Sequence, residues 1–191
     1  MPSLETKPST GPVVFDLETN GLLNDATRIH CIVLHWLEED RTEVYNDEPY
    51  AKSPKELPMA SNYSITTAIS HLEVADTIIG HNIIGFDIPI IKKLYTYFNP
   101  SGTIVDTLIL SRLYHPNLFD IDKKRNWKHM PLQLYGRHSL ESYGYRLSEY
   151  KGNFAKTTDW SEWSQEMQDY CIQDVVVTNK LCKHFLPYLT G

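Results

Sequence analysis

The 191-residue sequence contains no apolar run that approaches the roughly 18 residues of a membrane-spanning helix. Its N-terminus, MPSLETKPSTGP, lacks the charged start and apolar middle of a signal peptide. Cysteine is scarce, and the three present, Cys31, Cys171 and Cys182, are scattered among apolar residues. That spacing argues against a disulfide framework or a zinc site and predicts reduced, buried thiols. We therefore expect a cytoplasmic protein with no membrane contact, and a flexible polar tail at residues 1–11.

Positive charge is also scarce, because 18 Lys and Arg face 24 Asp and Glu, for a net charge of −6. This balance argues at first against a nucleic-acid partner. It does not exclude one, since carboxylates that hold divalent cations are neutralised by them. The one clearly basic segment is KKRNWKHM at 123–130. Whether it is a solvated loop or a contact for a nucleic-acid backbone stays open at this stage.

The pattern of elements predicts a single α/β domain over residues 12–191. Strands are expected at 11–18, 29–37, 42–46 and 77–82, and a strand running into a helix at 103–114. Helices are expected at 64–75, 87–98 and 138–147, with one or two more at 161–185. Residues 47–63 and 115–137 are expected to be loops. The order indicates a mixed β-sheet covered by helices.

Acidic residues end the first predicted strand. Side chains two apart in a strand point to the same face, so Asp16 and Glu18 can ligate one metal ion together. A D-x-E triplet also arises by chance in a chain of this size. Taken alone, this pair does not define a site.

Two further segments carry polar residues on suitable elements. HNIIGFDIPII at 81–91 places Asn82 and Asp87 where a strand exits into a helix, although Asp87 read in isolation is a helix N-cap and Phe86 is core. Tyr170 and Asp174 are four residues apart, so they share one face of a helix. The simplest interpretation of that pair is a Tyr–Asp hydrogen bond on a partly exposed face.

The combination is more specific than its parts. D-x-E, N-x-x-x-F-D and helical Y-x-x-x-D in this order resemble the DEDD superfamily of 3′–5′ exonucleases in its tyrosine branch, with Asp16, Glu18, Asp87 and Asp174 as the acids and Tyr170 as the branch marker. The histidine branch would need a histidine where this chain has Asp169. Within the superfamily the chain resembles the N-terminal proofreading domains of T-odd bacteriophage family A DNA polymerases. The segments that carry this likeness are HNIIGFDIPII, DTLILSRLYHPNL, RHSLESYGYRLSEYKG and MQDYCIQDVVVTNKLC.

The resemblance implies an RNase H-like fold, a mixed sheet with an antiparallel edge and the acids at one end. It also implies two divalent cations, Mg²⁺ with Mn²⁺ as a substitute, because hard oxygen ligands suit these ions. Asp16, Glu18 and Asp174 would hold the first ion, and Asp16 and, through water, Asp87 the second. Tyr170, whose phenol ordinarily titrates near pH 10, would orient the attacking water rather than act as a free base.

Substrate contacts also follow from the resemblance. Thr19 and Leu22 would touch the terminal 3′-OH and wedge against the last base, although Leu22 equally fits a packed turn. Asn82 would bind phosphate or sugar and Phe86 would stack on a base. Asp106 either supports the acids or caps the helix that follows it.

The expected activity is a metal-dependent 3′–5′ exonuclease acting on single-stranded or frayed DNA 3′ ends. The setting would be DNA replication, as the proofreading domain or subunit of a phage-type DNA polymerase in the host cytoplasm. Two alternatives remain from the sequence. The same acids serve a 3′–5′ exoribonuclease, and the fold also serves a non-catalytic nucleic-acid-binding module.

Overall fold

A computed structural model describes residues 10–48, 64–149 and 159–190, and these residues form a five-stranded mixed sheet flanked by helices. The strands lie in the order β3-β2-β1-β4-β5. Their bounds are β1 Pro12–Thr19, β2 Ile29–Trp36, β3 Arg41–Tyr45, β4 Thr77–Gly80 and β5 Thr103–Asp106. The β1–β2 and β2–β3 pairs are antiparallel, whereas β1–β4 and β4–β5 are parallel. The predicted α/β fold with an antiparallel edge is confirmed.

Alternation along β1 assigns its residues to two faces of the sheet. Val13, Phe15 and Leu17 belong to one apolar cluster, while Val14 belongs to another on the opposite face. By the same period of two, Asp16 and Glu18 point to the face of Val14. β1 is the central strand, so both acids are carried by the most enclosed strand of the sheet.

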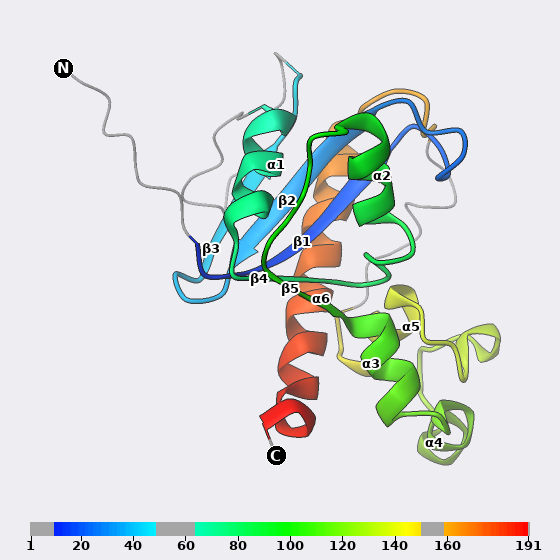
Figure 1. Cartoon of the computed structure of the whole chain (residues 1–191). Coiled ribbons are helices and arrows are strands. Elements are labelled where there is room, and N and C mark those ends of the chain that lie inside the picture. Colours follow the sequence, from blue (N-terminus) through cyan, green and yellow to red (C-terminus); the bar gives the residue numbers. More distant parts are fainter. Residues whose placement is uncertain (1–9, 49–63, 150–158, 191) are drawn as a thin grey trace.

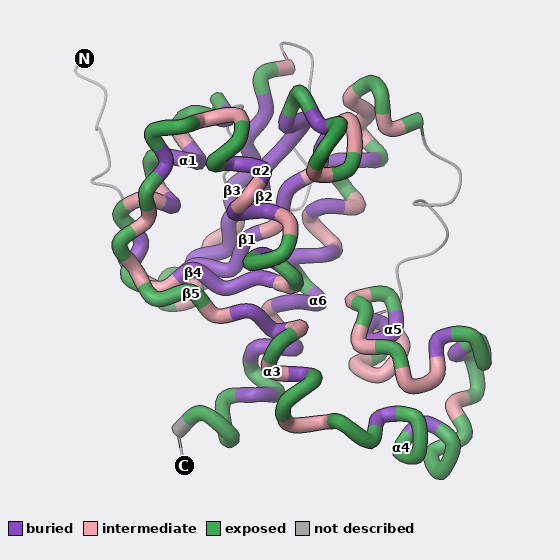
Figure 2. The backbone as a smooth tube through the Cα atoms, turned by 45° about the vertical axis from the view of Figure 1, so that its right-hand side comes forward, coloured by how far each residue is buried: buried purple, intermediate pink, exposed green. Residues whose placement is uncertain are grey.

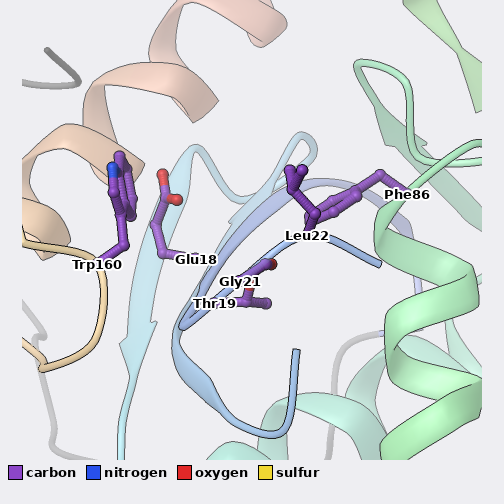
Figure 3. A pocket seen from close by; sticks show the side chains of 6 residues that line it. All are labelled: Glu18, Thr19, Gly21, Leu22, Phe86 and Trp160. Atoms are coloured by element: carbon purple, nitrogen blue, oxygen red, sulfur yellow. The ribbon is translucent and has the colours of Figure 1, made fainter. Parts of the chain in front are cut away.

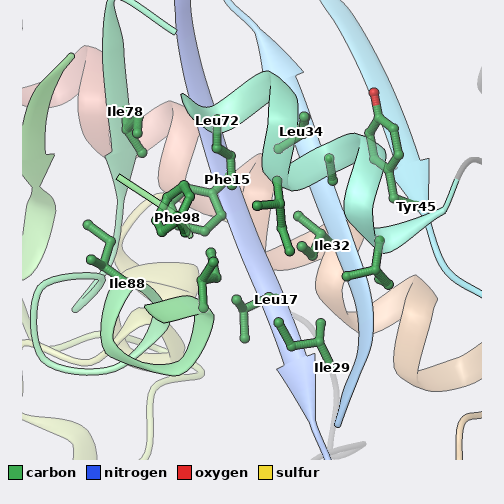
Figure 4. Packing of buried hydrophobic residues seen from close by; sticks show 14 of the residues in the cluster. Phe15, Leu17, Ile29, Ile32, Leu34, Tyr45, Leu72, Ile78, Ile88 and Phe98 are labelled. Carbon is green, nitrogen blue, oxygen red and sulfur yellow. The ribbon is translucent and has the colours of Figure 1, made fainter. Parts of the chain in front are cut away.

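The first face is covered by two helices, α1 (Ile65–Val74) and α2 (Asp87–Leu94) (Figure 1). Ser64 caps α1, because its hydroxyl accepts a hydrogen bond from the backbone N–H of Thr67. Figure 4 shows Phe15 and Leu17 of β1 packed with residues of β2, β3, α1 and α2. This core fixes the start of α2 beside the end of β1.

The opposite face is covered by one long helix, α6 (Gln165–Thr190) (Figure 1). The prediction of one or two helices at 161–185 therefore resolves to one. One face of α6 packs on the sheet through Cys171, Val175 and Cys182. Another face packs through Val177, Leu181 and Phe185 against Leu118 and Tyr143 of the smaller helices.

Those smaller helices are α3 (Thr107–Tyr114), α4 (Leu118–Arg125) and α5 (Leu140–Arg146), with a short 3₁₀ helix at Leu132–Leu134. The prediction that 115–137 is a loop is wrong, since α4 and the 3₁₀ helix lie within it. Helix α2 is also shorter than the predicted 87–98, and Phe98 packs in the core after the helix has ended. Figure 2 shows the strands as the buried centre of the molecule and α4 as mostly exposed.

One buried carboxylate explains why the polar segment around α4 folds. Asp122, 0% exposed, accepts hydrogen bonds from Nε and Nη2 of Arg146, Nε1 of Trp127 and the backbone N–H of Gly136. Gly136 has a φ of 73°, a backbone conformation that glycine adopts without strain. These partners lie up to 24 residues from Asp122, beyond the reach of a local pattern.

One other prediction is confirmed by these residues. All three cysteines are free and buried, as predicted. Across the described ranges, no helix is both long enough and apolar enough to span a membrane. The predicted tail at 1–11 and loop at 47–63 lie almost wholly outside the described residues.

Candidate active site

The site is built at the end of β1, where pairing with β2 becomes irregular. The register shifts between Glu18 and Thr19, a bulge of the kind that re-aims side chains at a strand end. Asp16 and Glu18 face α6, and ligand atoms of Asp16, Glu18 and Cys171 all lie within 4.8 Å of one another. The Cys171 thiol donates a hydrogen bond to Asp16 Oδ2 at 3.6 Å. Two of the predicted acids are thus brought together.

Asp87 joins this pair from the other side of β1. It is 3% exposed and lies in the first turn of α2. Burial and then the charge of Asp16 raise the pKa of Asp87 well above its usual range, while a backbone hydrogen bond from Leu17 opposes the shift. Asp87 is not the N-cap, because Phe86 holds that position without a side-chain cap. The alternative interpretation of Asp87 as a cap is therefore wrong.

A carboxylate on β5 holds the turn that delivers Asp87. Asp106 accepts hydrogen bonds from the backbone N–H of Asn82 and Ile84 and also from that of Leu108, which makes it the N-cap of α3. Asn82 has a φ of 64°, in the left-handed region that Asn tolerates better than most residues. Asp106 thus combines the two roles that the sequence left open.

Two further residues come from α6. Tyr170 is half-buried, and burial together with the charges of Glu18 and Asp16 raises the pKa of its phenol. The Tyr170 hydroxyl therefore keeps its proton at neutral pH. Asp174 is 7% exposed and lies one turn later on the same face of the helix. Asp169, where the histidine branch would have histidine, is exposed and accepts a hydrogen bond from Gln165.

A pocket of about 290 Å³ opens next to the acids and is lined by Glu18, Thr19, Gly21, Leu22, Phe86 and Trp160. Figure 3 shows Trp160 and Glu18 on one side and Leu22 and Phe86 on the other. Leu22 is 74% exposed, so it is not packed core. The Thr19 hydroxyl donates to the carbonyl of Gly21 at 2.7 Å, which fixes the turn between them.

Thr19, Leu22 and Phe86, which the sequence predicted as substrate contacts, all line this pocket. The sequence analysis assigned no role at the site to Cys171 or Trp160. Asn82 lies in the turn before α2 and is not among the residues that line the pocket. Cys171 was interpreted as an ordinary buried thiol. Its position next to Tyr170 in the sequence could have indicated that it lies beside the acids. Trp160 was not singled out, and its local sequence carries no comparable signal. In the same segment as Asn82, His81 is hydrogen-bonded through Nδ1 to the Thr107 hydroxyl.

The donor set suits a hard divalent cation. Asp16 and Glu18 offer carboxylate oxygens, the ligands that Mg²⁺ and Mn²⁺ prefer, with Asp87 beside Asp16. Burial and the charge of Asp16 make the ionised form of Asp87 unfavourable. A cation that compensates these negative charges would stabilise the cluster. The residues present therefore fit a magnesium or manganese centre.

Comparison with known proteins agrees with this geometry. A model of the RNase H superfamily matches residues 13–186. The DNA-directed DNA polymerase of Escherichia phage T7 is 32% identical over 206 aligned residues, covering 92% of this chain and 27% of the polymerase. The corresponding polymerase of Enterobacteria phage T3 is 30% identical, with the same coverage of each chain. This chain thus spans about a quarter of the length of the curated relatives that it matches.

Solved structures share the fold. Brucella melitensis NrnC superposes with a TM-score of 0.57 at 19% identity, covering 96% of this chain and 75% of NrnC. Other structures of that protein contain pGG or Mg²⁺. At 19% identity, the similarity to NrnC shows that the two proteins share an arrangement of strands and helices.

Proposed function

The chain belongs to the RNase H superfamily, and from this membership and the geometry at the end of β1 we propose that it is a metal-dependent 3′–5′ exonuclease acting on single-stranded or frayed DNA 3′ ends. One observation carries the proposal. Asp16 and Glu18 converge beside the buried Asp87 and the protonated Tyr170, next to a pocket with apolar walls. A phosphodiester seated there would have its terminal nucleoside in the pocket and its phosphate at the acids.

In this proposal Asp16, Glu18, Asp87 and Asp174 hold two divalent cations, Mg²⁺ or Mn²⁺. When bound, such ions lower the pKa of water and stabilise the charge on the leaving oxygen. The protein contributes fixed ligands. The Cys171 thiol hydrogen-bonds one oxygen of Asp16, and the backbone of Leu17 hydrogen-bonds the Asp87 carboxyl group, so neither carboxylate has to be oriented during the reaction.

Tyr170 is assigned to orienting the attacking water. Its raised pKa means that the phenol donates a hydrogen bond and does not remove a proton at neutral pH. Its position beside Glu18 and Asp16 suits this role, because a water held there would lie between the phenol and the carboxylates. Removing the hydroxyl while keeping the ring, as in Tyr170→Phe, is expected to lower kcat more than it changes KM.

The pocket supplies the terminal nucleoside site. Leu22 and Phe86 provide apolar and aromatic surface for a base, and the Thr19 oxygen keeps lone pairs that can accept a hydrogen bond from a 3′ hydroxyl. Asn82 is proposed to contact phosphate or sugar from the rim of the site, since its side chain is exposed. A paired terminus would have to fray before its last base could enter.

The direct test uses single-stranded DNA and RNA oligonucleotides of one sequence, labelled at the 5′ end, with Mg²⁺ or Mn²⁺. Progressive shortening of DNA from the 3′ end is expected, and a 3′-labelled copy should release its label in the first step. Asp174→Ala should abolish the ladder. Asp169→Asn is the matched control, because it removes an exposed acid from the same helix. Tight binding without cleavage would instead support a non-catalytic nucleic-acid-binding module.

A second candidate is a 3′–5′ exoribonuclease using the same acids. The structure of NrnC with pGG, a protein of the same fold, is the observation that favours testing it. The RNA arm of the assay decides between the two, through the ratio of kcat/KM for DNA and RNA. Preferential RNA degradation would overturn the DNA assignment while keeping the mechanism.

The biological setting is also part of the proposal. The relatives are DNA polymerases of which this chain matches about a quarter, so we propose a proofreading role together with a polymerase domain or subunit. Proofreading predicts that a mismatched 3′ terminus is degraded faster than a paired one. Equal rates on both termini would favour an independent nuclease.

A further inference from the structure

Trp160 lies opposite Leu22 and Phe86, the residues proposed to bind the base, and the proposed mechanism assigns it no role. It lines the pocket together with Leu22 and Phe86, which come from the β1–β2 turn and the start of α2. In Figure 3 the indole lies across the opening from both of these side chains. The pocket thus has apolar surface on two opposing sides, with Thr19 and Gly21 between them.

The Trp160 backbone is anchored from β2. Nε2 of His30 lies 3.0 Å from the carbonyl oxygen of Trp160, and His30 is 1% exposed. A carbonyl only accepts, so Nε2 must carry the hydrogen. Burial lowers the pKa of His30, which keeps the ring neutral in that tautomer. The segment before α6 is therefore held to the sheet at this residue.

The Trp160 indole is anchored from α6. It meets the ring of Tyr170 edge to face, with centroids 6.4 Å apart and planes at 80°. This is a favoured geometry for an aromatic pair. Trp160 consequently contacts both the nucleoside pocket and the residue assigned to orient water.

The pocket volume limits what can enter. At about 290 Å³ it lies at the lower end of small-molecule sites. One unpaired base between an indole and the Leu22–Phe86 wall suits this space, whereas a base pair does not. Aromatic side chains bind bases of any sequence in this way, because every base offers a π-face.

We propose that Trp160 is a base-binding residue, which stacks on the unpaired 3′-terminal base and so closes the nucleoside site from the side opposite Leu22 and Phe86. The proposal rests on the function proposed above, since it assigns the occupant of the same pocket. Its second consequence concerns Tyr170. A base stacked on the indole would hold the Trp160 ring in place, and the Tyr170 ring packs against that indole. Binding of a base in the pocket would therefore help to hold the Tyr170 phenol in position.

The experiment separates binding from cleavage. A labelled single-stranded oligonucleotide is titrated with protein in EDTA, where no turnover occurs, and affinity is measured by fluorescence anisotropy. Trp160→Ala is expected to weaken binding about 5- to 150-fold, the range measured for loss of one base–aromatic stack. Trp160→Phe should bind within a few-fold of wild type, because it keeps an aromatic face.

A second measurement locates the base. Stacking should quench tryptophan fluorescence when unlabelled oligonucleotide binds, and Trp160→Phe should remove that quenching while retaining affinity. Trp163→Phe is the matched control, three residues away, partly buried and not among the residues that line the pocket. It should keep both affinity and quenching. Circular dichroism confirms that each variant is folded.

The outcomes are distinguishable. Unchanged affinity in folded Trp160→Ala, or quenching that survives in Trp160→Phe, would overturn the role of Trp160 even if the wild type degrades DNA. Failure of the wild type to cleave DNA or RNA would overturn the proposed function. The affinities measured in EDTA would still test whether Trp160 binds a base. Loss of affinity in Trp160→Ala with rescue in Trp160→Phe supports the proposal.

Discussion

The carboxyl group of Asp87 is buried beside that of Asp16, and the charge of Asp16 adds to burial in raising the pKa of Asp87. An acid whose pKa is raised on folding holds its proton more tightly in the folded state than in the unfolded one. Stability therefore falls as pH rises from the unfolded value, near 3.9, toward the folded value. In the absence of cations, this pair of acids opposes folding at neutral pH.

Asp87→Asn should consequently stabilise the cation-free protein. The amide keeps the shape of the carboxylate and removes the charge, so the thermal midpoint in EDTA at about pH 8 is expected to rise by roughly a few degrees. Added Mn²⁺ should raise the midpoint of the wild type more than that of the variant. Thermal unfolding followed by circular dichroism measures both effects. A variant that is less stable in EDTA and equally stabilised by Mn²⁺ would contradict the assignment.

Asp106→Ala tests the turn before Asp87. Three backbone N–H groups, those of Asn82, Ile84 and Leu108, lose their acceptor. The expected cost is about 2 kcal/mol or more of unfolding free energy, from one lost helix cap and two further unpaired donors. Activity should also fall because Asp87 loses its support. Urea unfolding measures the change in unfolding free energy. Asp106→Asn keeps one acceptor oxygen and should recover part of the stability and part of the activity.

Leu22→Ala separates function from stability. Leu22 is 74% exposed, so its loss should change the unfolding free energy by less than about 0.5 kcal/mol. If Leu22 contacts the terminal base, kcat/KM on single-stranded DNA should fall about tenfold, the effect of losing partial burial of one leucine. Leu113→Ala, at a 64% exposed position on α3, is the matched control. Equal activity in both variants would remove Leu22 from the substrate site.

Much of the fold was predictable because its strands are short, apolar and bounded by turn residues. The five strands follow local periodicity, and the strand that runs into a helix at β5–α3 was predicted in the same way. Helix α4 was missed because only Leu118 and Asp122 are buried in it. Asp122 ties the helix to Arg146, Trp127 and Gly136, and no local pattern encodes the contact with Arg146.

Part of the site was predictable because some of its side chains are spaced along the sequence at the period of a strand or a helix. D-x-E and Y-x-x-x-D each place two side chains on one face of an element, and the sheet then brings Asp16, Glu18 and Tyr170 together. Trp160 has no such spacing. Its position depends on His30, 130 residues earlier, and on the ring of Tyr170. The metal and catalytic roles themselves stay predictions until the variants are assayed.

The buried Asp122 predicts a specific pH dependence of stability. Burial alone would raise its pKa, but the hydrogen bonds from Arg146, Gly136 and Trp127 lower it overall. A lowered pKa stabilises the fold above the unfolded value, near 3.9, and this contribution is lost as pH falls through the folded value. Asp122→Ala should cost about 3–5 kcal/mol at neutral pH, because Arg146 is left as a buried charge without its partner.

The measurement is urea unfolding of wild type and Asp122→Asn across pH. The difference in unfolding free energy between them should be largest at neutral pH and shrink below about pH 4. Asp120→Asn, an exposed acid on the same helix, is the control and should show little difference at any pH. A gap that does not change with pH would show that shape, not charge, makes Asp122 stabilising.

Two sets of basic residues in the 115–137 region lie on different parts of the molecule. Lys123, Lys124 and Arg125 are exposed in the last turn of α4, which Figures 1 and 2 place away from the end of β1. Arg137 instead lines a pocket of about 490 Å³ together with Glu141, whose charge contributes to the raised pKa of Tyr170. Arg137 therefore shares a pocket with a residue that acts electrostatically on Tyr170.

This separation predicts a dependence on oligonucleotide length. Neutralising Lys123, Lys124 and Arg125 with glutamine should reduce the slope of log affinity against log salt by roughly 2 for long single strands, because each phosphate contact on a single strand contributes about 0.7. The same triple variant should bind di- and trinucleotides as wild type does, since a short strand seated at the acids does not extend to α4. Arg137→Gln should weaken both. A slope that is unchanged at every length would show that α4 is solvated surface, and a loss already present with dinucleotides would show that α4 reaches the active site.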